Sequence, residues 1–272
     1  MSGARSNCSP TSPIGVFDSG VGGLSIAKAL QKAQPSEDII YVADSLHAPY
    51  GEKSEDFVSQ RCHRIVEFLA SKQVKLVVVA CNTATLNCIS ELRANFSMPF
   101  VGAEPGIKPA LAASLTGTIG VMATQSTLES AKYQRLLARY AGKHKVINQA
   151  CNGLVEQIES NDFDSDKTIG LLRKYLEPML LNNADQIVLG CTHYGFLTPQ
   201  INVLLQDRAQ LVNTSAAIAR QTTNLLEAHN LLTPNTVRGK VSVYSSGYDQ
   251  RFEHSVQALW DTPLASIDLF AG

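Results

Sequence analysis

The protein has 272 residues, of which 44% are hydrophobic, and its 23 basic residues nearly balance its 24 acidic ones. A chain of this length has room for one large domain or for two domains of about 100–150 residues each. The balanced charge argues against nucleic acid or an anionic membrane as the main partner, and no hydrophobic run approaches the roughly 20 residues that span a bilayer.

Residues 1–13 are rich in Ser and Pro and lack the hydrophobic stretch of a signal peptide, so they predict a flexible leader on a cytoplasmic protein. Beyond them, short hydrophobic runs alternate with longer amphipathic stretches. The runs predict buried strands at residues 14–17, 39–42, 76–80, 100–102, 119–122, 145–148 and 187–189. The amphipathic stretches predict helices at residues 24–33, 54–72, 128–140, 167–182 and 216–228. This alternation is typical of an α/β fold with mainly parallel sheets.

Two features of the first half of the chain recur in the second half in the same order. The Ile-Gly-Val of residues 14–16 recurs at residues 119–121, an offset of 105. The hydrophobic run that ends at Cys81 recurs as the run that ends at Cys191, an offset of 110. The pattern predicts two similar α/β halves, with the two thiols at equivalent strand ends in facing halves.

A glycine-rich loop, residues 17–23, follows the first predicted strand and opens a helix. Its glycines let the backbone approach a ligand, and N–H groups at the start of a helix attract an anion. The dinucleotide pattern G-x-G-x-x-G is broken at Ser25, and the Walker lysine is missing. Because Asp18 would repel a phosphate, the loop suits an amino-acid zwitterion better, with Ser19 near its carboxylate. The alternative is a tight turn capped by Asp18 or Ser19.

A second polar segment follows the second predicted strand and contains Asp44, Ser45 and residues 49–51, Pro-Tyr-Gly. The carboxyl ends of strands in α/β sheets line the crevice where ligands bind. The segment therefore predicts either part of a ligand site or a plain surface turn.

The cysteines are widely spaced and form no C-x-x-C pair, so neither a disulfide framework nor a zinc site is expected. Cys62 and Cys88 fall on predicted helices and are expected in the core, Cys8 lies in the leader, and Cys151 stays ambiguous. Cys81 and Cys191 each follow a strand and precede a helix-like segment whose amides stabilise a thiolate. A lone cysteine in such a place is more often a small buried apolar residue, so the pairing carries the interpretation.

Two facing thiols suit the inversion of a carbon centre. One group removes a proton from one face, the other delivers a proton to the opposite face, and the roles exchange with direction. The α-proton of an amino acid is very weakly acidic, and pyridoxal enzymes meet this difficulty with an electron sink. No pyridoxal or metal motif stands out, so the sequence predicts a cofactor-independent amino-acid racemase that relies on positioning and exclusion of water.

Five motifs closely resemble those of bacterial glutamate racemases and follow the family order: GVFDSGVGGLS (15–25), YVADS with PYGEKS (41–54), ACNTAT (80–85), IGVMAT (119–124) and LGCTHY (189–194). The resemblance implies an isomerase that interconverts L- and D-glutamate without metal or other cofactor and supplies D-glutamate for peptidoglycan and cell-wall synthesis. It also implies two α/β domains with the active site in the cleft between them. Residues 14–99 plus 212–272 would form the first domain and residues 100–211 the second.

The resemblance also assigns roles by position. Cys81 resembles the thiol that deprotonates the D-isomer, and Cys191 the thiol that deprotonates the L-isomer. Asp18 resembles the acid beside the first thiol, and His193 and Glu156 resemble helpers beside the second. Substrate contacts are expected, on the same basis, at Asp18, Ser19, Ser45, Tyr50, Gly51, Asn82, Thr83, Thr124, Thr192 and His193.

The resemblance further implies a small-molecule substrate and a homodimer, with neither nucleic acid nor membrane as partner. The chain departs from the family pattern at Asn152 and Gly195, where Pro is common, and at Asn213, where Asp is usual. These departures bear on the side-chain pocket and leave the paired thiols untouched. Three alternatives stay open: an aspartate racemase on the same scaffold, a two-lobed amino-acid-binding protein, and a hydrolase with a cysteine nucleophile.

Overall fold

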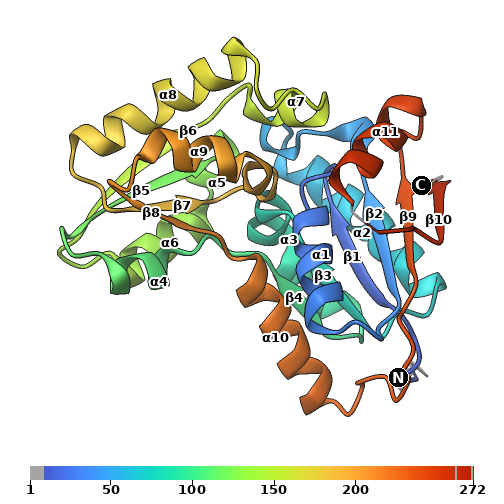
Figure 1. The fold of residues 1–272 in the computed structure, drawn as a ribbon. Helices are drawn as coiled ribbons and strands as arrows, with labels where there is room; N and C mark the ends of the chain where they lie inside the picture. The colour runs from blue at the N-terminus through green and yellow to red at the C-terminus, as the bar shows by residue number, and fades with distance from the viewer. Residues whose placement is uncertain (1–8, 261, 271) are drawn as a thin grey trace. The chain divides into compact units, whose positions relative to one another are not determined.

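The structure is a computed structural model that describes residues 9–260, 262–270 and 272. The chain divides into two compact units, Met1–Ala103 with Ser215–Gly272 and Glu104–Thr214, whose elements are traced in Figure 1. The borders expected at 99/100 and 211/212 therefore fall at 103/104 and 214/215. Of the predicted leader, residues 1–8 with Cys8 lie outside the described residues. Residues 9–12 form a turn in which the Ser12 amide donates to the Ser9 carbonyl at 2.9 Å.

The first unit is built on a six-stranded sheet in the order β10-β9-β2-β1-β3-β4, with parallel neighbours throughout. Its central strands are uninterrupted hydrophobic runs, because both faces of a parallel sheet are covered. The strands are β1 (Ile14–Asp18), β2 (Ile39–Ala43), β3 (Leu76–Val79), β4 (Phe100–Gly102), β9 (Val241–Ser245) and β10 (Ser266–Leu269).

Helices of the first unit follow its strands and bury one face each. In α2 (Glu55–Ser71) the buried residues include Cys62, Ile65 and Leu69, the stripe that the sequence predicts. The side chain of Ser54 caps this helix by accepting a hydrogen bond from the Phe57 amide. The other helices are α1 (Leu24–Ala33), α3 (Asn82–Asn95), α10 (Ser215–Ala228), α11 (Gln250–Leu259) and the short 3₁₀ helices η1 (Ser45–His47) and η2 (Tyr50–Glu52).

The second unit contains a four-stranded parallel sheet in the order β6-β5-β7-β8. Its strands are β5 (Thr118–Ala123), β6 (Lys145–Ala150), β7 (Gln186–Leu189) and β8 (Gln210–Val212). Its helices are α4 (Ile107–Ala113), α5 (Gln125–Glu129), α6 (Ala131–Tyr140), α7 (Leu154–Glu159), α8 (Asp166–Leu181), α9 (Thr198–Leu205) and the 3₁₀ helix η3 (Thr192–Leu197).

The repeat in the sequence corresponds to matching strand positions in the two sheets. Gly15 of β1 pairs with Val77, four residues before Cys81, and Gly120 of β5 pairs with Ile187, four residues before Cys191. The residue before each cysteine also makes the same bond: the Ala80 amide donates to Phe17 at 2.8 Å, and the Gly190 amide donates to Met122 at 2.7 Å. Cys81 and Cys191 therefore follow equivalent strands, β3 and β7, of two similar α/β units.

The structure differs from the sequence prediction at several elements, including β4, the helix predicted over 128–140, β9 and β10. Strand β4, which the predicted border gave to the second domain, is hydrogen-bonded to β3 and lies in the first unit. The helix predicted over 128–140 is broken at Ser130, whose extended backbone and side chain cap α6 instead. The strands β9 and β10 were not predicted, because the alternating pattern of β9 is short and only half hydrophobic.

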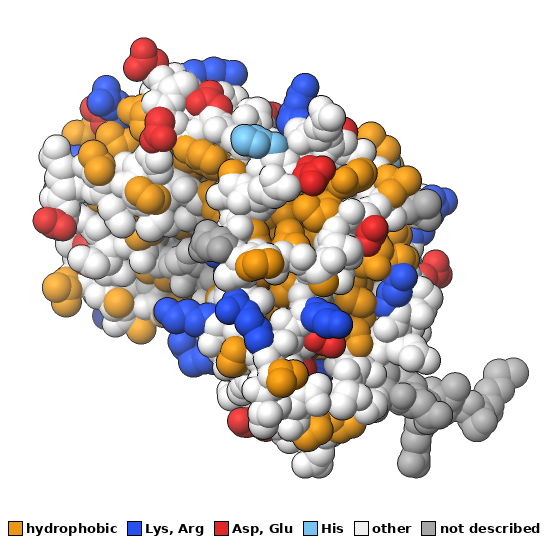
Figure 2. All heavy atoms as spheres, turned by 45° about the vertical axis from the view of Figure 1, so that its right-hand side comes forward, with side chains coloured by type: hydrophobic (Ala, Val, Ile, Leu, Met, Phe, Trp, Pro, Cys, Tyr) orange, Lys and Arg blue, Asp and Glu red, His pale blue; other side chains and the backbone are white. Residues whose placement is uncertain are grey.

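The surface carries charges of both signs. On the face drawn in Figure 2, acidic and basic side chains are interspersed with hydrophobic ones, and a small group of Lys and Arg side chains gathers in the lower half of the view. Among the described residues, no helix is both long enough and hydrophobic enough to span a membrane.

Candidate active site

Cys81 lies at the carboxyl end of β3 and caps the N-terminus of α3. The Ala84 amide donates a hydrogen bond to its sulfur at 3.5 Å, and the sulfur lies 3.8 Å from the hydroxyl oxygen of Ser19. The residue is only 6% exposed. The backbone N–H groups at a helix start and a neighbouring hydroxyl are groups that stabilise negative charge on sulfur.

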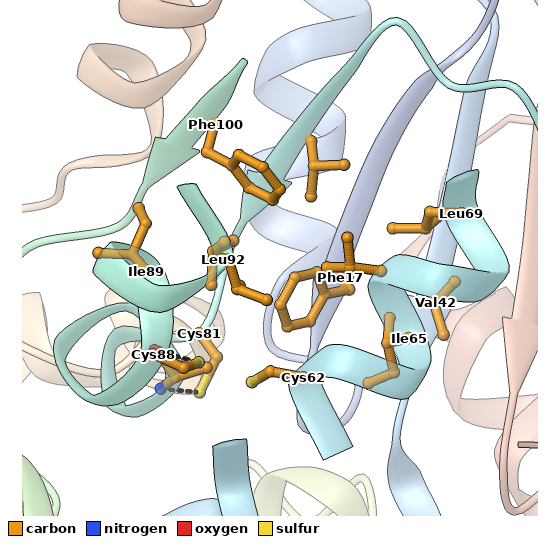
Figure 3. Packing of buried hydrophobic residues seen from close by; sticks show 14 of the residues in the cluster. Phe17, Val42, Cys62, Ile65, Leu69, Cys81, Cys88, Ile89, Leu92 and Phe100 are labelled. Carbon is orange, nitrogen blue, oxygen red and sulfur yellow. Dashed lines mark hydrogen bonds between the residues drawn. The ribbon is translucent and has the colours of Figure 1, made fainter. Parts of the chain in front are cut away.

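The interior behind Cys81 is a hydrophobic cluster between β1, β3, α2 and α3, drawn in Figure 3. Cys62 of α2 and Cys88 of α3 belong to it and are fully buried, so their prediction as core cysteines is confirmed. Burial, together with the neighbouring Cys88, raises the pKa of the Cys62 thiol well above its ordinary value. Cys62 is therefore held as a neutral thiol.

The glycine-rich loop brings Asp18 and Ser19 to the same edge of the sheet as Cys81. Asp18 is completely buried at the end of β1, and its Oδ1 accepts a hydrogen bond from the Gly20 amide at 2.9 Å. A Cβ on Gly23 would lie 2.8 Å from the Cβ atoms of both Asp18 and Ala80. Gly23 is thus required for close packing rather than for a positive φ. The loop therefore forms a tight turn and also brings polar residues to the sheet edge near Cys81, so the two interpretations of the sequence do not exclude each other.

The other predicted contacts of the first unit follow β2 and β3. Asn82 and Thr83 are the first residues of α3 and are buried, and the Asn82 side-chain amide donates to the Ala103 carbonyl at 2.9 Å. Ser45 lies in η1, and its buried hydroxyl has no hydrogen-bond partner within the described part of the chain. Tyr50 and Gly51 open η2.

Cys191 lies at the carboxyl end of β7 and directly precedes η3, which it does not cap through its side chain. Its partner is His193, whose Nδ1 lies 3.8 Å from the sulfur. The other ring nitrogen of His193, Nε2, lies 2.6 Å from Oε1 of Glu159 at the end of α7. The second thiol thus lies beside a histidine–carboxylate pair, whereas the first lies beside a helix start and a hydroxyl.

His193 is buried, and its proton is held by the groups on both sides. Burial alone would lower the pKa of His193, but the hydrogen bonds with Cys191 and Glu159 outweigh burial and raise this pKa well above 6.5. A ring that keeps its proton at neutral pH can pass one to Cys191 or take one back.

Glu159, rather than the expected Glu156, is the carboxylate that meets His193. Glu156 lies one turn earlier on α7 and is exposed. Both are acidic residues of the same short segment, and the motif alone does not show which of them faces His193. The helical turn of α7 brings Glu159 to the ring. Cys151 is buried after β6, and burial together with the nearby Cys191 raises the pKa of its thiol above its ordinary range.

Thr124 and Thr192 complete the predicted contacts of the second unit. Thr124 follows β5 and caps α5, accepting a bond from the Thr127 amide at 3.3 Å. Thr192 directly follows Cys191. Each unit therefore collects its predicted site residues at the carboxyl ends of its central strands, where α/β sheets bind ligands.

Comparison with known proteins decides the family. Residues 24–222 match the family described as Asp/Glu/Hydantoin racemase. The chain belongs to this family. Its α/β fold and the resemblance expected from the five sequence motifs are thereby confirmed.

Similar members of the racemase family match over almost their whole length. A glutamate racemase of Herpetosiphon aurantiacus is 49% identical over 247 residues, which are 91% of this chain and 97% of that protein. One of Pseudomonas putida is 44% identical over 93% of this chain and 95% of that protein. Among solved structures, a glutamate racemase isoform of Bacillus anthracis is 30% identical with a TM-score of 0.85, covering 95% of this chain and 97% of that one.

A second solved structure was determined with ligands. The glutamate racemase of Escherichia coli, in complex with L-glutamate and the activator UDP-MurNAc-Ala, is 32% identical with a TM-score of 0.85. The match covers 95% of this chain and 98% of that one.

Proposed function

We propose that this racemase interconverts L- and D-glutamate without a cofactor, by moving protons through Cys81 and Cys191, and so supplies D-glutamate for peptidoglycan synthesis. The observation that carries the proposal is the equivalent placement of the two thiols, each four residues beyond a strand position that pairs with a glycine of the neighbouring strand. The similarity to a glutamate racemase at 49% identity supports glutamate as the substrate.

The chemistry explains why two equivalent thiols are useful. Inversion requires a base on one face of the α-carbon and an acid on the other, one as thiolate and the other as thiol. From L-glutamate, Cys191 takes the α-proton and Cys81 delivers its own proton to the opposite face. From D-glutamate the roles exchange, so each turnover leaves the pair ready for the reverse reaction.

The two thiols have different assistants in this mechanism. On the side of Cys81, Ser19 lies 3.8 Å from the sulfur and Asp18 is its neighbour in the chain, and these two residues handle charge and proton there. His193, held by Glu159, does the same for Cys191. The proposed substrate contacts are the polar groups at the strand ends, namely Asp18, Ser19, Ser45, Tyr50, Gly51, Asn82, Thr83, Thr124, Thr192 and His193.

The substrate assignment is tested by incubating the purified protein with L-glutamate and, separately, with L-aspartate while following optical rotation. We expect the rotation of L-glutamate to decay to zero and that of L-aspartate to persist. Decay with aspartate alone would make the protein an aspartate racemase. Binding of glutamate without any decay would make it an amino-acid-binding protein.

We also infer, from the resemblance to the family, that the enzyme acts as a homodimer in the cytoplasm. Light scattering on the purified protein tests the first part: a mass near twice the 29.4 kDa of the chain is expected, and a mass of a single chain would contradict it.

A further inference from the structure

A fully buried carboxylate, Asp44, lies directly after β2 in the first unit. Arg61 donates to it twice, from Nε to Oδ2 and from Nη2 to Oδ1, each at 2.9 Å. The Tyr50 hydroxyl donates to Oδ2 at 2.6 Å, and Nδ1 of His47 lies 3.0 Å from Oδ1. Two parallel N–H bonds from an arginine fix the orientation of a carboxylate, so this cluster is a rigid one.

The cluster joins both halves of one loop to a long helix. His47 belongs to η1 and Tyr50 to η2, so the single carboxylate of Asp44 holds the two 3₁₀ turns together. Arg61 comes from α2 and is itself anchored, because its Nη1 donates to the Gly272 carbonyl at 2.9 Å and its guanidinium lies 5.9 Å from the ring centre of Phe270.

The electrostatics keep this arrangement in one state at neutral pH. Burial favours the neutral acid, but hydrogen bonds from Arg61, Tyr50 and His47 outweigh it and lower the pKa of Asp44. Burial, with the nearby Cys62 and Asp44, raises the pKa of the Tyr50 hydroxyl well above its ordinary value. Tyr50 therefore remains a hydrogen-bond donor to an ionised Asp44.

The loop between η1 and η2 can offer a ligand few polar groups. The Tyr50 side chain is 1% exposed, and its hydroxyl is committed to Asp44. Its remaining polar groups are those of the backbone. Tyr50 and Gly51 of η2 are among the proposed substrate contacts, and Gly51 has no polar side chain, so both can contact a ligand only through their backbone groups.

We propose that the Asp44–Arg61 pair is a positioning element of the racemase, which orients the backbone amides of Tyr50 and Gly51 toward a carboxylate of the substrate. The inference rests on the proposed function, since it takes the substrate to be an amino acid with carboxylates. Neither Asp44 nor Arg61 touches the substrate; they act through the loop between η1 and η2.

The test compares two charge-conserving or near-isosteric variants of the pair, Arg61→Lys and Asp44→Asn, with the wild-type protein. Lysine keeps the charge but lacks the two parallel donors. We expect KM for both glutamate isomers to rise about tenfold with kcat changed far less, the pattern of lost uniform binding. We expect Arg61→Ala to raise KM further, so that Arg61→Lys is a partial rescue.

A matched control separates positioning from stability. Lys75 and Glu37 form another buried ion pair of the first unit, just before the first residues of β3 and β2 and so at the other end of the sheet. Glu37→Gln is expected to lower the unfolding midpoint at least as much as Arg61→Lys does, yet to leave KM unchanged. All KM values are measured well below the lowest unfolding midpoint.

The outcomes are distinct. A raised KM in the Asp44 and Arg61 variants with an unmoved KM in Glu37→Gln supports the proposal. An active wild-type protein whose Arg61→Lys variant loses stability but keeps its KM would overturn this inference alone. A wild-type protein that does not racemise glutamate would overturn the proposed function and this inference with it.

Discussion

Replacing Glu159 by Gln should change the pH dependence of turnover through His193. In the wild type, Oε1 of Glu159 lies 2.6 Å from Nε2 of the ring and helps to raise the pKa of His193. A close opposite charge shifts a pKa by about 1–3 units. Because the Glu159 side chain is 22% exposed, water screens part of this effect, and we expect the pKa of His193 to be lower in the variant than in the wild type.

The assay is the pH profile of kcat/KM for the wild type and for Glu159→Gln. Deprotonation of L-glutamate requires the Cys191–His193 pair to hold one proton, so a lower pKa of His193 moves the alkaline limb to lower pH. The two isomers have equal free energy, so kcat/KM must be the same in both directions at every pH. Asymmetry between the thiols therefore shows only in kcat and KM taken separately.

The same profile distinguishes the two acidic residues of α7. If Glu156→Gln moved the alkaline limb and Glu159→Gln left it in place, the assignment of the helper to Glu159 would be refuted. An unmoved limb in both variants would show that His193 does not set the pH dependence.

Three further predictions concern stability and packing. Glu37→Gln leaves Lys75 as an unpaired buried charge and should cost about 3–5 kcal/mol of unfolding free energy in urea; a loss under about 1 kcal/mol would contradict the pairing. In Gly190→Ala the new Cβ would lie 3.0 Å from the Met122 carbonyl oxygen, and because Gly190 directly precedes Cys191, the shift should lower kcat about tenfold. In Gly170→Ala the new Cβ meets no atom within 4 Å, so this helix position should keep kcat and gain about 0.5–1 kcal/mol of unfolding free energy. The pKa of Asp44 is lowered in the folded state, so the stability that the ionised carboxylate contributes is present above the ordinary pKa of 3.8 and is lost as the pH falls through the folded-state pKa. Asp44→Asn should therefore flatten the acid dependence of the thermal midpoint, and an unchanged dependence would argue against this role of Asp44.

The sequence predicts the framework of the fold well because most of its strands are continuous hydrophobic runs bounded by polar or glycine-rich segments. The runs at 14–17, 76–80 and 187–189 are buried on both faces, and the repeat that they form marks the two thiols as equivalent from the order of residues alone. Strand β9 escapes prediction because only alternate residues are buried, and its place in the sheet depends on pairing with β2, which is distant in the chain.

The site is predictable where its residues stand next to each other in the chain and not where they meet through folding. Cys81, Asn82 and Thr83 are visible as one motif. Arg61 lies within an amphipathic helix, and nothing near it in sequence announces that it will meet Asp44. Glu159 is similar, since only the turn of α7 decides which of two carboxylates faces His193.

The central claim is that one thiol takes the α-proton and another delivers its replacement. The most direct test is racemisation of L-glutamate in D2O, stopped early, with deuterium measured separately in the D-glutamate formed and in the L-glutamate that remains. Because the delivering thiol exchanges with solvent before substrate binds, the product should carry deuterium at the α-carbon while the remaining substrate carries none. Cys81→Ser and Cys191→Ser should each reduce product formation by orders of magnitude. Equal deuterium in product and remaining substrate, or wild-type rates in both variants, would contradict the two-thiol mechanism.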